Sequence, residues 1–377
     1  MQFIDLKTQY ARLKVEIGAR IQNVLERQAF IQGPENAELE KALAEFSGAR
    51  RVITCANGTD ALQLALMALN IGPGDAVFVP SFTYTATAEV ILLLGAQPVF
   101  VDSDPETFNI DFESAEAAIV RTMREGKFRP AVLMTVDLFG QPVDYDRARS
   151  LADQYQLAFV SDAAQGFGAD YRGRRIGSGL ADITTTSFFP AKPLGCYGDG
   201  GAVFTDDDDI ADVIRSICLH GKGAAKYDVV RVGVNSRLDT VQAAILLPKL
   251  AVFADELEAR HQVATAYIER LAAHVQTPLP APEGARFAWA QFTIKIEDRD
   301  GLQARLKAAG VPSNVYYPRP MHLQPAYEQF GDGVGSLPMA EALSDQVLSL
   351  PMHPYLTVSE IDQVCAAVRH ALLVPAN

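Results

Sequence analysis

The spacing of hydrophobic residues predicts two helices at the start of the chain and an alternation of strands and helices after them. Apolar residues recur at helical intervals through 6–25 and again through 39–46. From residue 51 onward, short runs rich in β-branched and aromatic residues alternate with helical stretches. These runs are Arg51–Thr54, Ala76–Pro80, Pro98–Asp102, Ala131–Val136, Leu157–Val160 and Ile183–Ser187. The alternation favours an α/β fold with a large, mostly parallel central sheet, which binds ligands at the carboxyl ends of its strands.

The last third of the chain has a different pattern, which predicts a second and smaller domain. Residues 238–271 are almost entirely helical in pattern, and the helix is long enough to connect two domains. Beyond it we expect strands at Phe287–Ile296 and Ser313–Tyr317 and helices at Gly301–Ala309 and Val358–Leu373. The chain of 377 residues is too long for one ordinary core. We therefore expect a large α/β domain over 1–250, with an N-terminal helical arm, and a connector helix and small α+β domain over 251–377.

Composition and charge narrow the class of protein. Hydrophobic residues make up 49% and charged residues 21% of the chain, which is typical of a soluble globular enzyme. The net charge of −13 argues against nonspecific binding of nucleic acid, which requires a basic surface. Residues 1–30 lack the order of a signal peptide, and no stretch is apolar for long enough to cross a bilayer, so we expect a cytoplasmic protein without a membrane partner. The four cysteines have no metal or disulfide spacing, so no metal site is expected.

Lys192 is the first candidate for chemistry. It lies in an apolar and glycine-rich segment, residues 186–201, directly after a predicted strand. Desolvation disfavours the ammonium form of a lysine and lowers its pKa, which makes the neutral amine available for a Schiff base with a carbonyl. A lysine that extends its charged end from a loop into solvent is the alternative, and this segment alone does not decide between them.

Two further segments have both a chemical and a purely structural interpretation. Asp162 ends a predicted buried strand, where a carboxylate needs a cationic partner such as a protonated pyridine nitrogen. It could instead cap the next turn. Gly58, Thr59 and Asp60 follow another strand and begin a helix, whose free N–H groups and dipole suit a phosphate. They could also be an ordinary capped helix start.

Together with other motifs, these segments resemble the DegT/DnrJ/EryC1/StrS group of sugar-nucleotide aminotransferases, within the fold-type I pyridoxal-phosphate enzymes. The resemblance covers almost the whole chain. The segments that carry it are Phe3–Leu6, Gln32–Pro34, Asn57–Leu62, Pro80–Tyr84, Asp162–Gln165, Ser187–Lys192, Gly198–Gly201, Gly233–Asp239, Gln242–Ala244 and His322–Tyr327. It implies pyridoxal 5′-phosphate as the cofactor, with pyridoxamine 5′-phosphate as its intermediate form.

The resemblance also implies how the cofactor ring is held. Lys192 forms the Schiff base, Asp162 pairs with the pyridine nitrogen and Gln165 approaches the ring hydroxyl. Tyr84 stacks on the ring, although a tyrosine at this position could equally pack in a core.

The cofactor phosphate is implied to lie between two chains. Ser187 binds it together with the turn from Gly58 to Asp60, and Asn235 reaches it from the neighbouring subunit. The resemblance therefore implies a homodimer with shared active sites. Without the resemblance, Asn235 would be interpreted as a turn residue before a helix.

The implied reaction has two halves. Glutamate donates its amino group and leaves as 2-oxoglutarate, and the keto sugar then enters and accepts the amino group. Lys192 anchors the cofactor and also transfers the proton as acid and base. Ping-pong kinetics are expected.

Binding of the sugar nucleotide is assigned to five residues. A diphosphate and a sugar carboxylate need donors, and Arg237 is the best basic candidate, unless it forms only a surface ion pair. Tyr316, Tyr317, Arg319 and His322 lie in the family's region for contacts with the nucleotide sugar, although His322 by itself would be interpreted as a surface histidine.

The identity of the sugar depends on finer details. Residues 235–240 and 350–355 are most similar to enzymes that aminate C3 of UDP-2-acetamido-2-deoxy-3-oxo-D-glucuronate for surface polysaccharide biosynthesis. Two departures affect this prediction: Asp137 stands where many members have histidine, and Tyr316 stands where this subgroup often has histidine. Both departures can alter the sugar pocket, so an aminotransferase of a dTDP-linked 3-keto- or 4-keto-6-deoxyhexose is the alternative.

Other classes of protein fit the sequence less well. A regulator that kept the fold without catalysis is possible, but Lys192, Asp162 and Gln165 are all retained. A dehydratase of the same scaffold has histidine in place of the lysine. A nicotinamide dehydrogenase needs a glycine fingerprint between its first strand and helix, whereas Gly198–Gly201 precedes a predicted strand.

Overall fold

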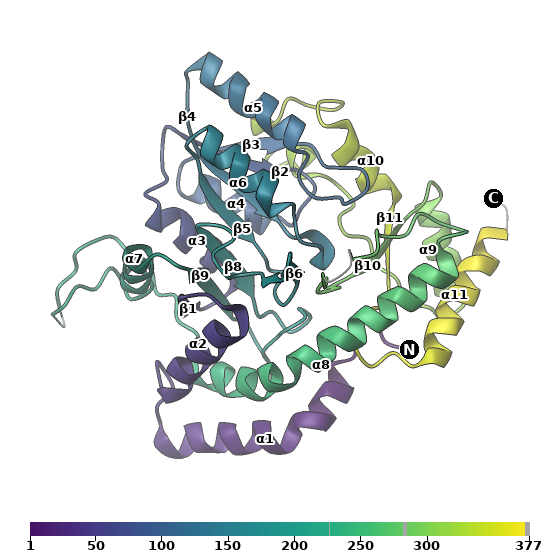
Figure 1. Cartoon of the computed structure of the whole chain (residues 1–377), viewed down its shortest axis with the longest axis horizontal. Coiled ribbons are helices and arrows are strands. Elements are labelled where there is room, and N and C mark those ends of the chain that lie inside the picture. The colour runs from purple at the N-terminus through teal and green to yellow at the C-terminus, as the bar shows by residue number, and fades with distance from the viewer. Residues whose placement is uncertain (226, 282–284, 374–377) are drawn as a thin grey trace.

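A seven-stranded sheet forms the centre of the larger part of the molecule in the computed structural model, which describes residues 1–225, 227–281 and 285–373 (Figure 1). The strand order is β1-β9-β8-β5-β4-β2-β3. Only β9 runs antiparallel to its neighbours, so the sheet is mostly parallel as predicted. The strands are β1 Arg51–Cys55, β2 Asp75–Pro80, β3 Gln97–Val101, β4 Arg129–Val136, β5 Ala158–Asp162, β8 Ile183–Ser187 and β9 Gly201–Thr205. A short hairpin, β6 Asp170–Tyr171 and β7 Arg174–Arg175, lies outside this sheet.

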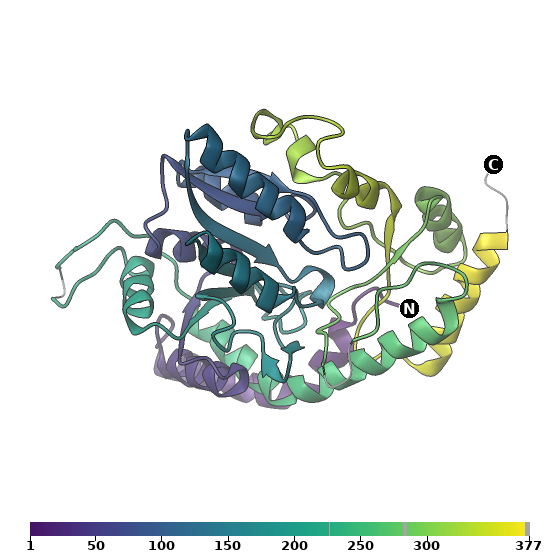
Figure 2. The same ribbon diagram turned by 45° about the horizontal axis from the view of Figure 1, so that its top comes forward.

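Helices cover both faces of the sheet, which explains why most of its strands are runs of apolar residues without alternation, although β8 consists mainly of buried threonines. One face packs against α2 Pro34–Ser47, α5 Phe112–Glu125, α6 Tyr145–Gln154 and the first half of α8 Thr240–Leu271. The other face packs against α3 Gly58–Ala68, α4 Ala86–Leu93 and α7 Asp208–Cys218. Figure 2 shows the sheet between these two layers. The α/β class predicted from the sequence is therefore confirmed.

The long helix α8 contributes to two hydrophobic cores. Its residues from Ala243 to Leu257 pack into the core of the large sheet, and those from Val263 to Leu271 pack into a second core. The second core is completed by β10 Phe292–Lys295, α9 Arg299–Ala308, β11 Val347–Leu350 and α11 Val358–Leu373. We propose that the chain divides into its two domains within α8, in the region of the predicted boundary at 250/251.

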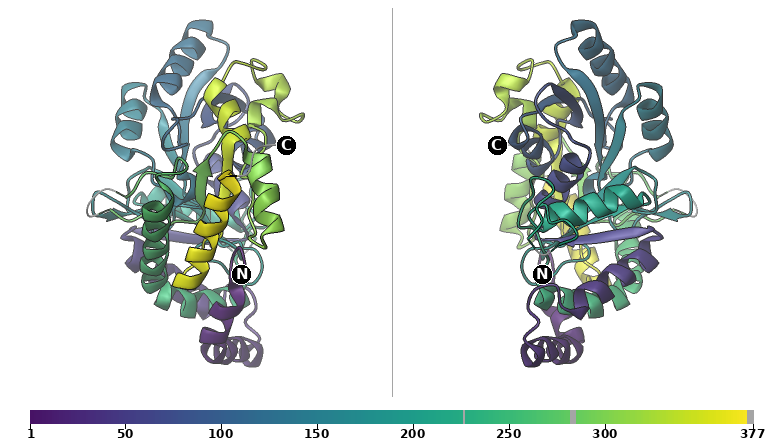
Figure 3. Two further views of the ribbon diagram at one scale, coloured as in Figure 1. Left: turned by 90° about the vertical axis from the view of Figure 1, so that its right-hand side faces the viewer. Right: turned by 90° about the vertical axis from the view of Figure 1, so that its left-hand side faces the viewer.

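The N-terminal helix α1, Leu6–Arg27, lies apart from the sheet and packs along α8 (Figure 3). Leu13 and Ile17 are buried against Ile245, and Gln9 Nε2 donates a hydrogen bond of 2.8 Å to the Glu256 carboxylate. Since α8 links both cores, these contacts place the first residues of the chain near the junction of the two parts. None of the helices in the described ranges combines the length and apolar character of a membrane span.

Two of the strands predicted in the small domain are wrong in whole or in part. Ser313–Tyr317 forms no strand and has only an isolated bridge, between Asn314 and Ser349. In the predicted strand Phe287–Ile296, regular structure begins only at Phe292. The preceding residues are irregular because their N–H groups pair with a turn of the large domain: Ala288 N donates to Gly140 O over 2.8 Å.

Candidate active site

Loops at the carboxyl ends of the parallel strands surround a cavity of about 720 Å³. Asp162 is the last residue of β5 and Ser187 is the last residue of β8. These strands are adjacent and parallel, with Asp162 opposite Thr185, so the two strand ends meet at one edge of the sheet. Lys192 lines the same cavity from the loop that follows β8.

One end of the cavity is formed by the start of α3. Gly58 is the first residue of this helix, and a Cβ atom at Gly58 would lie 2.6 Å from Ser187 Cβ, so only glycine allows this close approach. Asn57 Oδ1 accepts the N–H of Asp60 over 2.8 Å. The first N–H groups of a helix have no partner within it, so those of Gly58 and Thr59 remain available for an anion.

Two hydrogen bonds to backbone oxygens fix the loop that carries Lys192. Lys192 N donates to Phe189 O over 2.9 Å, and the buried Lys249 of α8 donates to Gly195 O. Burial lowers the pKa of the Lys192 amine, and the nearby Asp162 carboxylate offsets part of this effect. The loop therefore presents an amine that loses its proton more readily than an exposed lysine.

Asp162 is 6% exposed and faces the same cavity. Burial raises the pKa of its carboxyl group, whereas hydrogen bonds from Ala164 N, over 3.1 Å, and Thr87 Oγ1, over 3.0 Å, act in the opposite direction together with Lys192. The sequence left open whether this residue caps a turn or meets a cation. It does accept the N–H of Ala164, and its position still leaves the carboxylate facing a cavity in which a cationic ligand would be stabilised.

Gln165 is fixed at both ends of its amide. Its Oε1 accepts the N–H of Phe139 over 2.6 Å, and its Nε2 donates to the Tyr317 hydroxyl over 3.1 Å. The Tyr84 ring lies 6.1 Å from that of Tyr317 and is 55% exposed, so Tyr84 is not a core residue. An exposed aromatic face beside the cavity can stack on a planar ligand.

The structure gathers most of the predicted site residues around this one cavity and leaves four outside it. Those that line it are Gly58, Thr59, Asp60, Tyr84, Asp162, Gln165, Ser187, Lys192, Tyr316 and Tyr317. Those outside it are Asn235, Arg237, Arg319 and His322.

Arg237 and Asn235 lie in the segment between α7 and α8. Arg237 lines a separate cavity of about 130 Å³ and forms no ion pair with any described residue of its own chain, so the surface ion pair left open by the sequence is absent there. Asn235 is exposed. Arg319 is also exposed, and its carbonyl oxygen accepts a hydrogen bond from Gln324 Nε2. None of these three side chains reaches Lys192 of its own chain.

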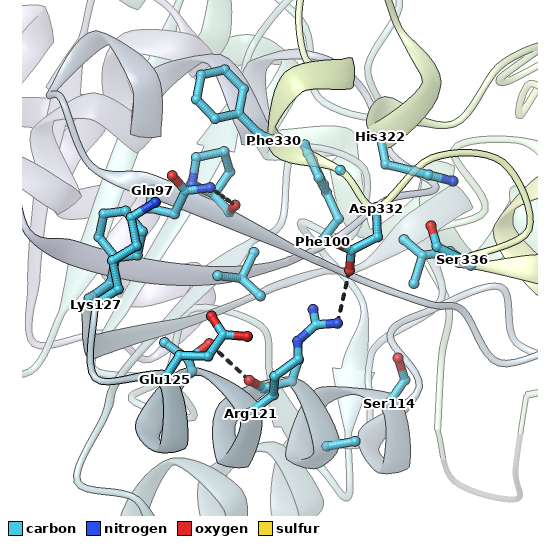
Figure 4. A pocket seen from close by; sticks show the side chains of 18 of the residues that line it. Gln97, Phe100, Ser114, Arg121, Glu125, Lys127, His322, Phe330, Asp332 and Ser336 are labelled. Carbon is cyan, nitrogen blue, oxygen red and sulfur yellow. Dashed lines mark hydrogen bonds and ion pairs between the residues drawn. The ribbon is translucent and has the colours of Figure 1, made fainter.

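The position of His322 does not fit the predicted contact with substrate. Its side chain is 0% exposed, and its ring nitrogens lie 2.7 Å from Ser81 Oγ and 3.2 Å from the Glu341 carboxylate. Figure 4 shows His322 beside another cavity, of about 480 Å³, at the β3 edge of the sheet, where Arg121 and Asp332 form an ion pair of 2.8 Å. His322 therefore acts as a buried structural residue that ties the segment after Pro320 to the large domain.

Asp137, one of the two departures noted in the sequence, also faces away from the cavity. It is fully buried, and its carboxylate accepts hydrogen bonds from Val143 N, over 2.9 Å, and Tyr145 Oη, over 2.7 Å. Burial raises its pKa to about 7. Asp137 therefore does not line the cavity, whereas Tyr316, the other departure, does.

The residues of the site that were missed in the sequence include Thr87, Gln291 and Lys249. Thr87 supports Asp162 and Gln291 lines the cavity, and neither position has a recognisable local pattern. Lys249 has a recognisable pattern, because it is a single lysine within the apolar run Ala243–Leu250. Such a residue is either a satisfied buried lysine or a functional one.

Comparison with known proteins agrees with this geometry. The DegT/DnrJ/EryC1/StrS aminotransferase family matches residues 11–369. The UDP-2-acetamido-2-deoxy-3-oxo-D-glucuronate aminotransferase of Pseudomonas aeruginosa is 49% identical, over 98% of this chain and 99% of its own length. A pleiotropic regulatory protein of Geobacillus stearothermophilus is 40% identical, over 97% of this chain and 98% of its own length.

Solved structures of aminotransferases are also similar to this chain. A DegT DnrJ EryC1 StrS aminotransferase from Brucella abortus superposes with a TM-score of 0.96 at 51% identity, covering 98% of this chain and 99% of the other. NtdA from Bacillus subtilis, with bound cofactor PMP, superposes with a TM-score of 0.88 at 32% identity, covering 99% of this chain and 83% of the other. The chain therefore belongs to the DegT/DnrJ/EryC1/StrS aminotransferase family.

Proposed function

We propose that the protein uses pyridoxal 5′-phosphate to transfer an amino group from glutamate to the keto group of a nucleotide-linked sugar. The observation that carries this proposal is the arrangement of Lys192, Asp162 and the Gly58–Ser187 contact around one cavity. An amine, a carboxylate and an anion site are the three groups that this cofactor requires of a protein.

The residues present fit the cofactor. The close approach of Gly58 to Ser187 brings the N-terminus of α3 and a hydroxyl together, which suits a phosphate. Asp162 is a buried carboxylate without a cationic hydrogen-bond partner among the described residues, and a protonated ring nitrogen would be such a partner. Gln165 would lie beside the ring and Tyr84 would stack on it.

In the reaction, Lys192 has the largest role among the residues of the chain. Its neutral amine accepts the proton from Cα of glutamate, and in the second half-reaction it exchanges a proton at the sugar carbon that receives the amino group. When bound, the cofactor supplies an electron sink that stabilises the negative charge left on these carbons. The held loop 188–200 keeps the Lys192 amine in place during both proton transfers.

The substrate that we propose is UDP-2-acetamido-2-deoxy-3-oxo-D-glucuronate, aminated at C3. The similarity to the Pseudomonas aeruginosa enzyme over nearly the whole chain supports it. A purely regulatory role, as in the name of the Geobacillus relative, is disfavoured because the cavity keeps Lys192, Asp162 and Gln165 together.

A two-step experiment tests this function. The protein loaded with pyridoxal 5′-phosphate is first treated with glutamate, and loss of the visible absorbance of the cofactor and release of 2-oxoglutarate are measured. UDP-2-acetamido-2-deoxy-3-oxo-D-glucuronate or a dTDP-linked 3-keto- or 4-keto-6-deoxyhexose is then added. We expect the absorbance to return with the UDP sugar. Return only with a dTDP sugar would show that the substrate is wrong, and no reaction with glutamate would contradict the enzymatic function.

We further propose that the active protein is a homodimer in which Asn235 and Arg237 complete the cavity of the partner. The segment between α7 and α8 projects from the body of the molecule, at the left of Figure 1. Its apolar side chains are unusually exposed, with Val229 at 67% and Val232 at 86%. Exposed apolar surface of this kind is typical of an interface between subunits.

Mixed dimers of two inactive variants test the shared site. One chain carries Lys192→Ala and the other carries Asn235→Ala with Arg237→Ala, and two affinity tags isolate the mixed dimer. One of its sites combines all three defects and the other has none, so we expect about half of the wild-type activity per mixed dimer, while each parent homodimer is nearly inactive. A mixed dimer as inactive as its parents would mean that each chain builds its site alone.

A further inference from the structure

Gln291 lines the cavity around Lys192, and its side-chain amide has no partner in the described part of the chain. The Oε1 atom is buried without a hydrogen bond, whereas Nε2, also without a hydrogen bond, is not buried. An amide at a cavity wall that lacks protein partners loses hydrogen bonds to water when a ligand fills the cavity, unless the ligand replaces them. This residue is therefore placed to meet a polar group of the ligand.

The backbone of Gln291 is fixed relative to the predicted cofactor site. Gln291 N donates to Phe139 O over 3.3 Å, and Phe139 N donates to Gln165 Oε1 over 2.6 Å. A single residue of the turn after β4 thus joins Gln291 to Gln165. Any ligand group that reaches Gln291 is positioned relative to the groups that Gln165 contacts.

Both segments at this junction have unusual backbone conformations. Phe139 has φ of 58° and Trp289 has φ of 48°, a region that large side chains rarely adopt. Gly140 lies so close that a Cβ atom there would be 2.6 Å from Trp289 N. Such conformations persist where the surrounding structure holds them, and they cluster at binding sites. The junction therefore holds residues 288–291 out of the β10 strand, and Gln291 of this segment lines the cavity.

Gln291 comes from a different part of the fold than the residues of the predicted phosphate site. It precedes β10 in the small domain and shares the cavity with Tyr316 and Tyr317, whereas Gly58 and Ser187 come from the large sheet and its helices. Gln291 is therefore not one of the residues expected to hold the cofactor phosphate.

Few cationic side chains of this chain line the cavity and could donate a hydrogen bond to a sugar oxygen. The charged side chains among its described lining residues are Asp60, Asp162, Asp199 and Lys192, and no arginine is among them. Apart from Lys192, the donors that this chain offers to sugar oxygen atoms in its own cavity are therefore hydroxyl and amide groups, and Arg237 would add a charged donor only from the partner. Since Oε1 of Gln291 is buried, Nε2–H is the end that a substrate can reach.

We propose that Gln291 is a specificity-determining residue, whose Nε2–H donates a hydrogen bond to a carboxylate or carbonyl oxygen on the sugar of the substrate. This inference rests on the proposed function, because it assumes that a keto sugar enters the cavity. In the proposed substrate, these oxygens belong to the C6 carboxylate and to the acetamido group at C2.

The test compares Gln291→Met, which keeps the size of the side chain without the donor, with Gln291→Glu, which replaces the donor by a carboxylate. For Gln291→Met we expect kcat/KM for the keto sugar to fall by about tenfold, the effect of one lost hydrogen bond. For Gln291→Glu we expect a loss of about 10- to 100-fold or more, because two oxygens then repel each other. The rate of the glutamate half-reaction and the visible absorbance of the bound cofactor should stay close to those of the wild type.

Two substrate analogues identify the oxygen. An analogue with methyl at C6, which has no oxygen there, should remove the difference between wild type and Gln291→Met if the carboxylate is the partner, and an analogue with hydrogen at C2 should remove it if the acetamido carbonyl is the partner. The exposed Gln276 offers a matched control, and Gln276→Met should change neither half-reaction. Equal kcat/KM for wild type and Gln291→Met, or equal losses with both analogues and the parent sugar, would overturn the inference. Failure of the wild type itself with every keto sugar would instead contradict the proposed function.

Discussion

Replacement of Lys192 by methionine is expected to slow amino transfer by at least about 10²–10⁴-fold, the usual contribution of a positioned acid and base. Methionine keeps much of the apolar stem of lysine but has no group that can accept a proton. Burial lowers the pKa of the Lys192 amine, so this amine is more often unprotonated, and able to accept a proton, than that of an exposed lysine. The rate of 2-oxoglutarate release after a single addition of glutamate measures this loss.

Borohydride reduction gives an independent readout on the wild type. Treatment of the loaded protein should attach the cofactor covalently to Lys192, and a peptide map should find it in the segment 188–200. Lys307, which is exposed on α9, is the matched control, and Lys307→Met should keep both the activity and the label. A label on another lysine, or full turnover by Lys192→Met, would be incompatible with the role that we assign to Lys192.

Replacement of Asp162 by asparagine is expected to reduce activity by about a hundredfold or more, while the apoprotein stays at least as stable as the wild type. A buried charge pair that loses one member costs about 3–5 kcal/mol, and each 1.4 kcal/mol is about tenfold in rate. The pyridine nitrogen would lose its charged partner, so the cofactor would become a weaker electron sink.

The expected stability of the Asp162→Asn apoprotein follows from the raised pKa of Asp162. Because burial raises this pKa above its unfolded value, the unfolded chain releases the proton at lower pH than the folded one. The contribution of Asp162 to stability therefore falls as pH rises through this range, and asparagine removes the cost at neutral pH. The difference in stability is measured by thermal unfolding of the wild-type and Asp162→Asn apoproteins at neutral pH.

Asp199 supplies the control for this substitution. It also lines the cavity but is exposed, so Asp199→Asn should have a much smaller effect on turnover. If Asp162→Asn unfolded at a clearly lower temperature, its loss of activity would reflect a damaged fold. If it kept full activity, Asp162 would not be the partner of the cofactor.

The sequence by itself predicted the large sheet and most of the cavity around Lys192, because both depend on short segments. Most of the parallel strands are apolar runs, β8 is a run of β-branched residues, and Asp162 and Ser187 come at the ends of β5 and β8. The start of α3 at Gly58 is marked by Asn57, whose side chain caps the helix locally. Strand ends on one edge of a parallel sheet must meet, so local patterns were sufficient to bring Asp162, Lys192 and the start of α3 together, whereas Ser187 was assigned to the site by the family resemblance.

The small domain and its side of the cavity were decided only by the tertiary structure. Phe287–Gln291 has the composition of a strand, but its N–H groups pair with the distant turn at Phe139 and Gly140. His322 was predicted to meet the substrate, and it is buried because Ser81 and Glu341 lie on either side of its ring. Hydrogen bonds between residues more than a hundred positions apart produce no periodic pattern that could be recognised in the sequence. The sequence therefore predicted the part of the cavity around Lys192, and only the tertiary structure decided which side chains of residues 287–350 line that cavity.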